Sequence, residues 1–261
     1  MSTHANALIG HSGFVGSTLL RQASFSSLYR STNINDIHGK SFHQVVCAAA
    51  PAQKWLANKD PEDDYRKIQG LIAHLKTFEC GTFILISTVD VFNSPISVDE
   101  DTPVDEADLH AYGIHRRQLE QFVEKHFPDH LIVRLPGLVG PGLRKNVIFD
   151  FLNDNNLHAI DSRGVFQFYP MVNLWPDIQT ALAHKLRLVH LTAAPISVAD
   201  VASGGFGKSF DQSLDRPAAR YDLHSKHVEI FGGQGCYQYN TRETLLAIRA
   251  YAQSEPRSLK S

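Results

Sequence analysis

The 261-residue sequence predicts an α/β fold in which a doubly wound parallel sheet is joined to a small C-terminal lobe. Three observations support this prediction. Short apolar runs alternate with amphipathic stretches as far as Pro136, as in strands connected by helices. Closely spaced glycines follow the first apolar run. Two later runs end in small or hydroxyl side chains, at the strand ends where parallel sheets bind ligands.

A strand, a tight turn and a helix are expected at the N-terminus. The apolar run 7–9 is followed by glycines with the spacing G-x-x-G-x-x-G, and an amphipathic pattern begins at once. Gly10 permits the turn, Gly13 lets the backbone approach a pyrophosphate, and Gly16 lets the helix pack on the strand. An ordinary strand–helix turn is the alternative. The context favours a Rossmann-type dinucleotide site formed by Gly10, Ser12, Gly13, Phe14, Val15 and Gly16.

The end of the second strand, expected within 25–32, bears on cofactor choice. An acidic residue there favours NAD, whereas an arginine favours the 2′-phosphate of NADP. The chain has Arg30 with Ser31 beside it, so NADP is slightly preferred over NAD; a solvated arginine in a turn is the alternative. Asp36 and Ile37 are expected to end a short third strand near the adenine.

Later strands are expected at 44–50, 82–88, 130–136 and 188–191. The first ends in Ala48, Ala49 and Ala50, which leave room for a ribose and phosphates or simply pack closely. The second delivers Ser87 and Thr88 to the same edge of the sheet, and Pro136 ends the third beside the cofactor. The expected helices begin near Asp60, Tyr112, Val147 and Trp175, with a capped helix at 197–206.

The predicted domain organisation follows from these elements. Residues 1–142 form the dinucleotide-binding core, to which 175–196 return, and residues 143–174 and 197–261 form the smaller substrate-binding lobe.

Composition excludes several function classes. A net charge of −2 lacks the basic excess that nucleic acids or anionic membranes require, so neither is an expected partner. No apolar run is long enough to span a membrane, and no secretory leader pattern opens the sequence. The three cysteines are far apart, which fits the cytoplasm. The 14 histidines show no ligand spacing, and no metal site is expected.

Tyr112 is the candidate catalytic acid/base. Arg116 follows four residues later, which places both side chains on one helix face. A phenol has an ordinary pKa of about 10 and acts as a base near neutral pH only where a nearby cation favours phenolate. Arg116 supplies such a cation, and the Thr88 hydroxyl could hold a substrate oxygen. Hydride exchange with a nicotinamide needs this kind of proton transfer.

Together the motifs cover the first 142 residues in order: the glycines, Ala48–Ala50, the run Ile86-Ser-Thr-Val-Asp-Val-Phe92, Tyr112 with its cation, and Arg134-Leu-Pro-Gly-Leu-Val-Gly-Pro-Gly142. In this the sequence resembles the extended short-chain dehydrogenase/reductase superfamily, within it the NAD-dependent epimerase/dehydratase family, and most closely proteins of the dTDP-4-dehydrorhamnose reductase type. The resemblance implies a sugar-nucleotide substrate, NAD(P), catalytic roles for Thr88 and Tyr112, and a homodimer. The substrate residues expected with it are Lys54, Asp90, Val91, Phe92, Arg144, Asn146 and Phe168.

One departure from the family pattern opens alternatives. The family has Tyr-x-x-x-Lys, where the lysine holds the nicotinamide ribose and lowers the pKa of the tyrosine. This chain has Arg116, which keeps the charge with a different shape. The sequence therefore predicts an oxidoreductase or epimerase with a Thr88–Tyr112–Arg116 variant of the triad. The alternative is an NAD(P)-binding regulatory or redox-sensing protein with little or no turnover. A third, weaker interpretation is a dehydratase that uses Asp90 as an added acid/base.

Overall fold

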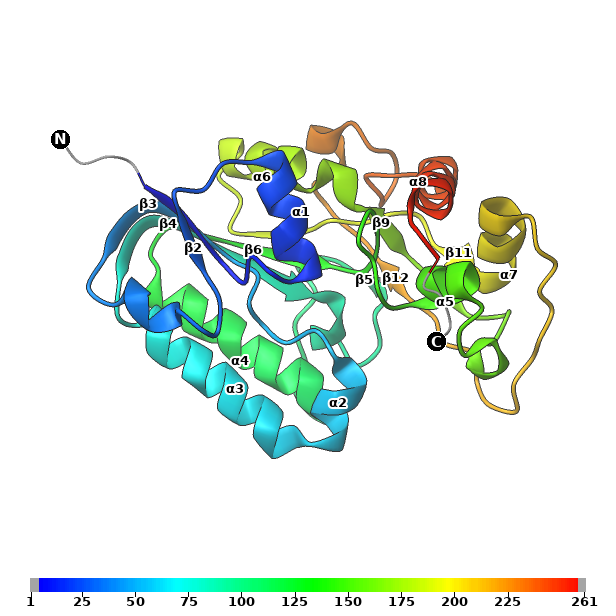
Figure 1. Ribbon diagram of the computed structural model, residues 1–261, viewed down its shortest axis with the longest axis horizontal. Coiled ribbons are helices and arrows are strands. Elements are labelled where there is room, and N and C mark those ends of the chain that lie inside the picture. Colours follow the sequence, from blue (N-terminus) through cyan, green and yellow to red (C-terminus); the bar gives the residue numbers. More distant parts are fainter. Residues whose placement is uncertain (1–4, 258–261) are drawn as a thin grey trace. The chain divides into compact units, whose positions relative to one another are not determined.

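The computed structural model describes residues 5–257, which form two compact units (Figure 1). The first unit comprises 5–93, Thr102–Arg134 and Trp175–Val189, and the second comprises Ser94–Asp101, Leu135–Leu174 and 190–257. The assignment of residues 1–142 with 175–196 to cofactor binding, and of residues 143–174 and 197–261 to substrate binding, stays a prediction. No helix within 5–257 is long and apolar enough to cross a membrane.

A six-stranded sheet contains β1 (Asn6–Ile9), β2 (Ser27–Tyr29), β3 (Ser41–Cys47), β4 (Glu79–Thr88), β6 (His130–Leu135) and β10 (Leu188–His190). The strand order is β10-β6-β4-β3-β1-β2. β1 pairs in parallel with β2 on one side and with β3 on the other, and β3 pairs in parallel with β4. The strand order therefore reverses at β1, and such switch points are where open α/β sheets bind ligands.

Helices cover both faces of this sheet (Figure 1). α1 (Phe14–Gln22) and α6 (Leu174–Ala183) lie on one face, and α3 (Pro61–Leu75) and α4 (Ala111–His126) on the other. The short α2 (Lys54–Lys59) precedes α3. Phe83 and Phe127 stack in the core with ring centroids 4.1 Å apart, beside the fully buried Ile68. The expected doubly wound α/β fold is confirmed.

The prediction that Asp36 and Ile37 end a short third strand is wrong. These residues lie in a 3-10 helix, Ile34–Ile37. The Asn33 side chain accepts from the Arg30 N–H at 2.8 Å and donates to the Leu28 carbonyl at 3.0 Å, which turns the chain immediately after β2. Ile37 is fully buried in the core, so its apolar side chain is satisfied without a strand.

Within the described residues, the second unit holds three two-stranded sheets, β8–β11, β5–β12 and β7–β9. Their strands are β5 (Ile96–Val98), β7 (Gly137–Val139), β8 (Val165–Phe166), β9 (Phe168–Pro170), β11 (Ile196–Ser197) and β12 (Asp222–Leu223). Its α-helices within the described residues are α5 (Val147–Asn153), α7 (Val198–Asp200) and α8 (Thr241–Ser254). Ser197 caps α7 as expected, but the helix expected over 197–206 changes into a π-helical turn over Val201–Gly205.

Candidate active site

The three glycines after β1 differ in what requires them. At Gly10 the backbone φ is +87°, and an added Cβ would lie 2.5 Å from the Ala48 carbonyl oxygen. A Cβ on Gly16 would overlap the Gly10 carbonyl. Gly13 has an ordinary φ of −75°, and its Cβ would meet nothing closer than the Gly10 oxygen at 3.5 Å. The protein's own packing therefore requires Gly10 and Gly16 but leaves Gly13 unexplained.

Gly13 is also the N-cap of α1. No side chain caps this helix, and its first turn holds no acidic residue. A helix N-terminus with these features suits an anion, because its unpaired N–H groups and positive dipole end attract negative charge. The position of Gly13 fits a pyrophosphate that approaches the backbone closely.

The other candidate cofactor residues occupy varied positions. Arg30 directly follows β2 and is exposed, with its Nε donating to the Thr32 hydroxyl at 3.0 Å; Ser31 and Asp36 are exposed as well. Ala48 to Ala50 follow β3 and are half-buried, and Pro136 is buried. The side chain of Ile37 lies in the core. Their contacts with a cofactor stay predictions.

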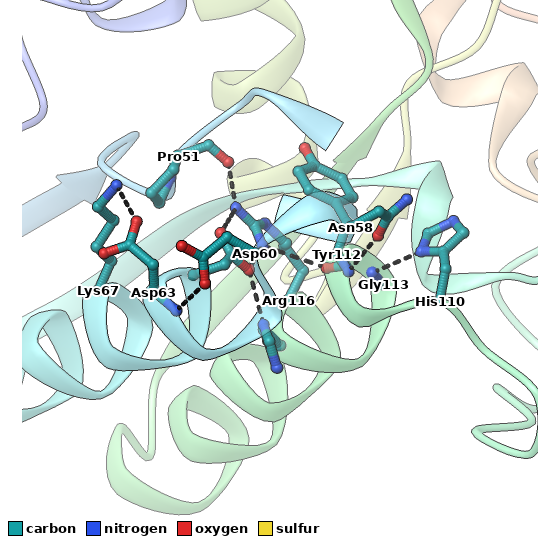
Figure 2. A network of polar contacts seen from close by, with 11 residues as sticks. Pro51, Asn58, Asp60, Asp63, Lys67, His110, Tyr112, Gly113 and Arg116 are labelled. Carbon is teal, nitrogen blue, oxygen red and sulfur yellow. Dashed lines mark hydrogen bonds and ion pairs between the residues drawn. The ribbon is translucent and has the colours of Figure 1, made fainter. Parts of the chain in front are cut away.

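Tyr112 stands at the start of α4, where neighbouring segments fix the helix. The Tyr112 N–H donates to Asn58 Oδ1 of α2 at 3.0 Å, and His110 Nδ1 accepts from the Gly113 N–H at 3.0 Å (Figure 2). A Cβ on Gly113 would overlap the Asp90 carbonyl. The glycine therefore lets α4 pack against the 3-10 helix Val89–Val91 that follows β4.

Thr88 and Tyr112, predicted to act together, are brought together in the first unit. The Thr88 side chain lies close enough to the Tyr112 phenol to lower its pKa. Tyr112 is 7% exposed, and this burial raises the pKa of its phenol. The Arg116 charge and the Thr88 side chain oppose that rise without cancelling it.

Arg116 is buried beneath Tyr112, with its Cζ 3.8 Å from the ring centroid. One terminal nitrogen, Nη2, donates to the Pro51 carbonyl (Figure 2). The same nitrogen donates to Asp64 Oδ1 at 2.9 Å, and Nη1 donates to the other oxygen of that carboxylate. The Nε–H is buried without a partner among the described residues. The guanidinium thus lies beside the phenol as predicted, but its charge is paired with a carboxylate.

Asp64 is the partner that the sequence analysis missed. Its carboxylate also contacts His115 Nδ1 at 2.7 Å. Burial disfavours the ionised carboxyl, but hydrogen bonds from Arg116 and His115 outweigh burial and hold the pKa of Asp64 below its ordinary value. Asp64 lies 52 residues before Arg116, and its place in an acidic first helical turn gave only a capping signal.

A second ion pair that the sequence analysis did not predict, between Glu120 and Arg134, contacts Ser87. The Ser87 hydroxyl donates to Glu120 at 2.6 Å, and Glu120, which is fully buried, accepts from Arg134 at 2.7 and 3.0 Å. Burial favours protonation of Glu120, yet the Arg134 hydrogen bonds keep its pKa below the ordinary value. In this structure Ser87 therefore anchors β4 to α4.

The candidate substrate residues divide between the two units. In the first unit, Lys54 Nζ lies 2.7 Å from Asp90 Oδ1. Val91 and Phe92 are buried, the latter with its ring 5.1 Å from the Arg134 guanidinium. In the second unit Arg144 is exposed, Asn146 caps α5, and Phe168 is buried in β9. Substrate contacts at all of these, and an acid/base role for Asp90, stay predictions.

Comparisons with known proteins bear on the fold. No sequence-family model matches the chain, and no curated protein does. A dTDP-4-dehydrorhamnose reductase from Clostridium acetobutylicum superposes with a TM-score of 0.72 at 17% identity, over 95% of this chain and 98% of that one. The fold is shared.

Two further structures agree with this finding. RMD from Pseudomonas aeruginosa, complexed with NADPH, gives a TM-score of 0.69 at 16% identity, over 96% of this chain and 99% of that one. A variant of the UDP-glucuronic acid 4-epimerase from Bacillus cereus, in complex with NAD and a UDP-sugar analogue, gives 0.71 at 16% identity, over 95% and 98%. The resemblance inferred from the motifs is confirmed at the level of the fold.

Proposed function

We propose that this chain is an NAD(P)-dependent oxidoreductase or epimerase of the extended short-chain dehydrogenase/reductase type, acting on a sugar nucleotide or a related hydroxy/keto substrate. Gly13 carries the proposal, because it is a glycine at a helix N-terminus that the protein's own packing does not require. The Thr88 side chain near the Tyr112 phenol favours a reaction that includes proton transfer. The NADPH and NAD complexes of structurally similar proteins support the cofactor class.

The residues around Tyr112 suit proton transfer coupled to hydride transfer. A bound nicotinamide supplies or accepts the hydride at the substrate carbon. Tyr112 gives a proton to the substrate oxygen during reduction and takes one during oxidation. Thr88 orients that oxygen through its hydroxyl. Arg116, stacked on the phenol, favours the phenolate that remains after the proton has left.

Arg116 also has one buried donor without a partner inside the described protein. Its terminal nitrogens bind Asp64 and Pro51, while its buried Nε–H has no partner among residues 5–257. Buried donors without partners are rare in folded proteins. The burial of Arg116 leaves a ribose hydroxyl no access to this donor, so the cofactor-holding role that the family assigns to lysine stays a prediction for Arg116.

The first experiment is a titration of the protein with NADPH and with NADH, followed by nicotinamide fluorescence. Both cofactors should bind saturably. Gly13→Ala should weaken binding by roughly tenfold or more, equivalent to about 1.4 kcal/mol, without lowering the unfolding free energy. Gly70→Ala is the matched control, because a Cβ at this exposed position in α3 would meet nothing within 4 Å. Unimpaired binding by Gly13→Ala would contradict the proposed site.

The same titration tests cofactor preference. Arg30, exposed directly after β2, is the candidate for the 2′-phosphate. We propose a preference for NADPH over NADH, which Arg30→Ala should reduce while leaving NADH affinity unchanged. Equal affinities in the unmodified protein would mean that neither cofactor is preferred, and would remove this role from Arg30.

The surroundings of Arg116 and Tyr112 also favour a second function. Because Asp64 compensates its charge and burial raises the pKa of Tyr112, the chain could bind NAD(P) as a regulatory or redox-sensing protein with little or no turnover. Saturable NADPH binding without oxidation against a panel of keto-sugar nucleotides would select this function. Turnover in that panel would select the enzyme.

A further inference from the structure

His38 and His74 face each other at the surface of the first unit. His38 is the C-cap of the 3-10 helix Ile34–Ile37, and His74 lies in the last turn of α3. His38 Nε2 lies 3.0 Å from His74 Nδ1, and the two ring centroids are 5.3 Å apart. His38 is exposed and His74 is half-buried, so the pair is open to solvent.

The backbone holds the two histidines close together without the help of their rings. The Gly39 N–H, next to the first histidine, donates to the Thr77 carbonyl at 2.7 Å, just beyond the second. Ile37 and Leu75, the other neighbours of the two histidines, are fully buried in the same hydrophobic core. Both imidazoles therefore extend from anchored segments, and the distance between them is set by the fold.

Two imidazole nitrogens at this separation match one edge of a metal coordination shell. A divalent ion such as Zn²⁺ binds an imidazole nitrogen at about 2.0–2.1 Å, so two bonds at a right angle place the nitrogens about 2.9 Å apart, and a tetrahedral angle places them about 3.3 Å apart. The 3.0 Å between His38 Nε2 and His74 Nδ1 is closer to the right angle. Right angles are typical of Cu²⁺ and Ni²⁺ in tetragonal sites, and Cu²⁺ binds nitrogen ligands the more tightly of the two.

A metal ion needs neutral imidazoles, because each ring must present a lone pair. Burial, and to a smaller extent the charge of His38, lowers the pKa of His74, so this ring is neutral near pH 7. A neutral imidazole carries one proton, which occupies the nitrogen that faces away once the metal has bound. The ion thus exchanges two water ligands for two nitrogens, and two neutral rings lose no proton in the exchange.

We propose that His38 and His74 form a surface site for a divalent transition metal ion with tetragonal preference, best satisfied by Cu²⁺. Within residues 5–257 no third histidine, cysteine or carboxylate joins them in a metal cluster, so water completes the coordination. The sequence analysis expected no metal site, because 36 positions separate these histidines in the chain. The site goes beyond the proposed function, since it requires neither NAD(P) nor turnover.

The test is a titration of the full chain, without an affinity tag, with Cu²⁺ alone at pH 7, followed by calorimetry and by electron paramagnetic resonance. A single ion should bind per chain with a micromolar dissociation constant, and pulsed spectra should show two coupled imidazole nitrogens. His38→Gln and His74→Gln should each lower the affinity about tenfold or more and leave one coupled imidazole. A purely structural hydrogen bond between the rings predicts no two-imidazole signal.

His158→Gln is the matched control, since it removes an exposed histidine from the second unit. Its Cu²⁺ affinity and spectrum should equal those of the unmodified protein. A single coupled imidazole in the unmodified protein, or an affinity that survives when His38→Gln and His74→Gln are combined, would overturn the inference. Neither readout involves NADPH or a substrate, so failure of the metal site and failure of the proposed function are separately visible.

Discussion

At the residue scale, Tyr112 depends on the glycine that follows it. Gly113 lets the start of α4 approach the Asp90 carbonyl, which places the phenol beside Thr88. The Asn58 side chain then fixes the Tyr112 N–H. The tyrosine is thus held by its backbone as well as by its ring, and removing the hydroxyl alone should leave the fold intact.

Tyr112→Phe should therefore abolish turnover and spare cofactor binding. Loss of a positioned acid/base typically lowers the rate by about 10²–10⁴-fold, while the glycine loop stays unaltered. Steady-state rates on any keto-sugar nucleotide that the protein reduces, together with the NADPH titration, measure both quantities. A variant that retains its rate would exclude Tyr112 as the proton donor.

Arg116→Lys restores the family residue but should not be conservative here. A lysine ammonium cannot maintain the guanidinium contacts with both Asp64 oxygens and with the Pro51 carbonyl. We expect a loss of about 1.5–3 kcal/mol in unfolding free energy, the range for hydrogen bonds to charged groups. Urea unfolding measures it, and an unchanged midpoint would show that the lysine maintains those contacts.

At the scale of elements, α3 and α4 are joined by a buried charge network. Asp64 of α3 binds Arg116 and His115 of α4, and all three side chains are almost completely buried. Removing one member of such a pair leaves the other charge uncompensated in the interior. The packing of these two helices therefore depends on the ionised state of Asp64.

Asp64→Asn should cost about 3–5 kcal/mol of unfolding free energy. The native pKa of Asp64 lies below its ordinary value of 3.8, so its contribution is full above about pH 4 and is lost as the pH falls through the native pKa. The variant should lose this part of the acid dependence in urea unfolding measured from pH 7 downward.

Asp60→Asn is the matched control for that measurement. Asp60 is exposed and caps α3 by accepting from the Asp63 N–H, which asparagine can also do. The charge change is the same, yet the stability should be almost unchanged. A similar loss in both variants would mean that Asp64 contributes only a surface charge.

Local signals explain how much of these elements could be predicted. Signals between residues close in sequence predicted elements that the structure contains. These signals are Gly10, the small residues after β3 and the spacing of Tyr112 and Arg116. The predicted third strand does not form, because the Asn33 side chain makes hydrogen bonds with the backbone that a β-ladder would otherwise make. Apolar periodicity at Ile34 and Ile37 cannot distinguish these outcomes.

The sequence analysis did not predict ion pairs between residues that are far apart in the sequence. Asp64 with Arg116, and Glu120 with Arg134, are pairs whose meaning arises only when separate elements pack. Asp64 is one of several acidic residues in the first turn of α3, and Glu120 lies within α4; neither position in the sequence indicates a buried partner. Both carboxylates are buried, which a single sequence does not reveal.

At the scale of the whole molecule, the family resemblance predicts a homodimer. Trp55 of α2 and Tyr65 of α3 are 67% and 45% exposed, and large exposed apolar side chains are common at protein interfaces. We expect sedimentation at twice the chain mass of 29.1 kDa. A monomer at micromolar and higher concentrations would contradict this prediction. Residence in the cytoplasm stays a prediction.

The exposed indole of Trp55, next to Lys54, is a candidate fluorescence reporter of cofactor binding. The sequence has two tryptophans, and the other, Trp175, packs edge-on against Phe25 at 5.8 Å. A Trp175→Phe protein would emit from α2 alone. Because indole emission overlaps the absorption of a reduced nicotinamide, energy transfer from this single emitter would report cofactor arrival in real time, without labelling.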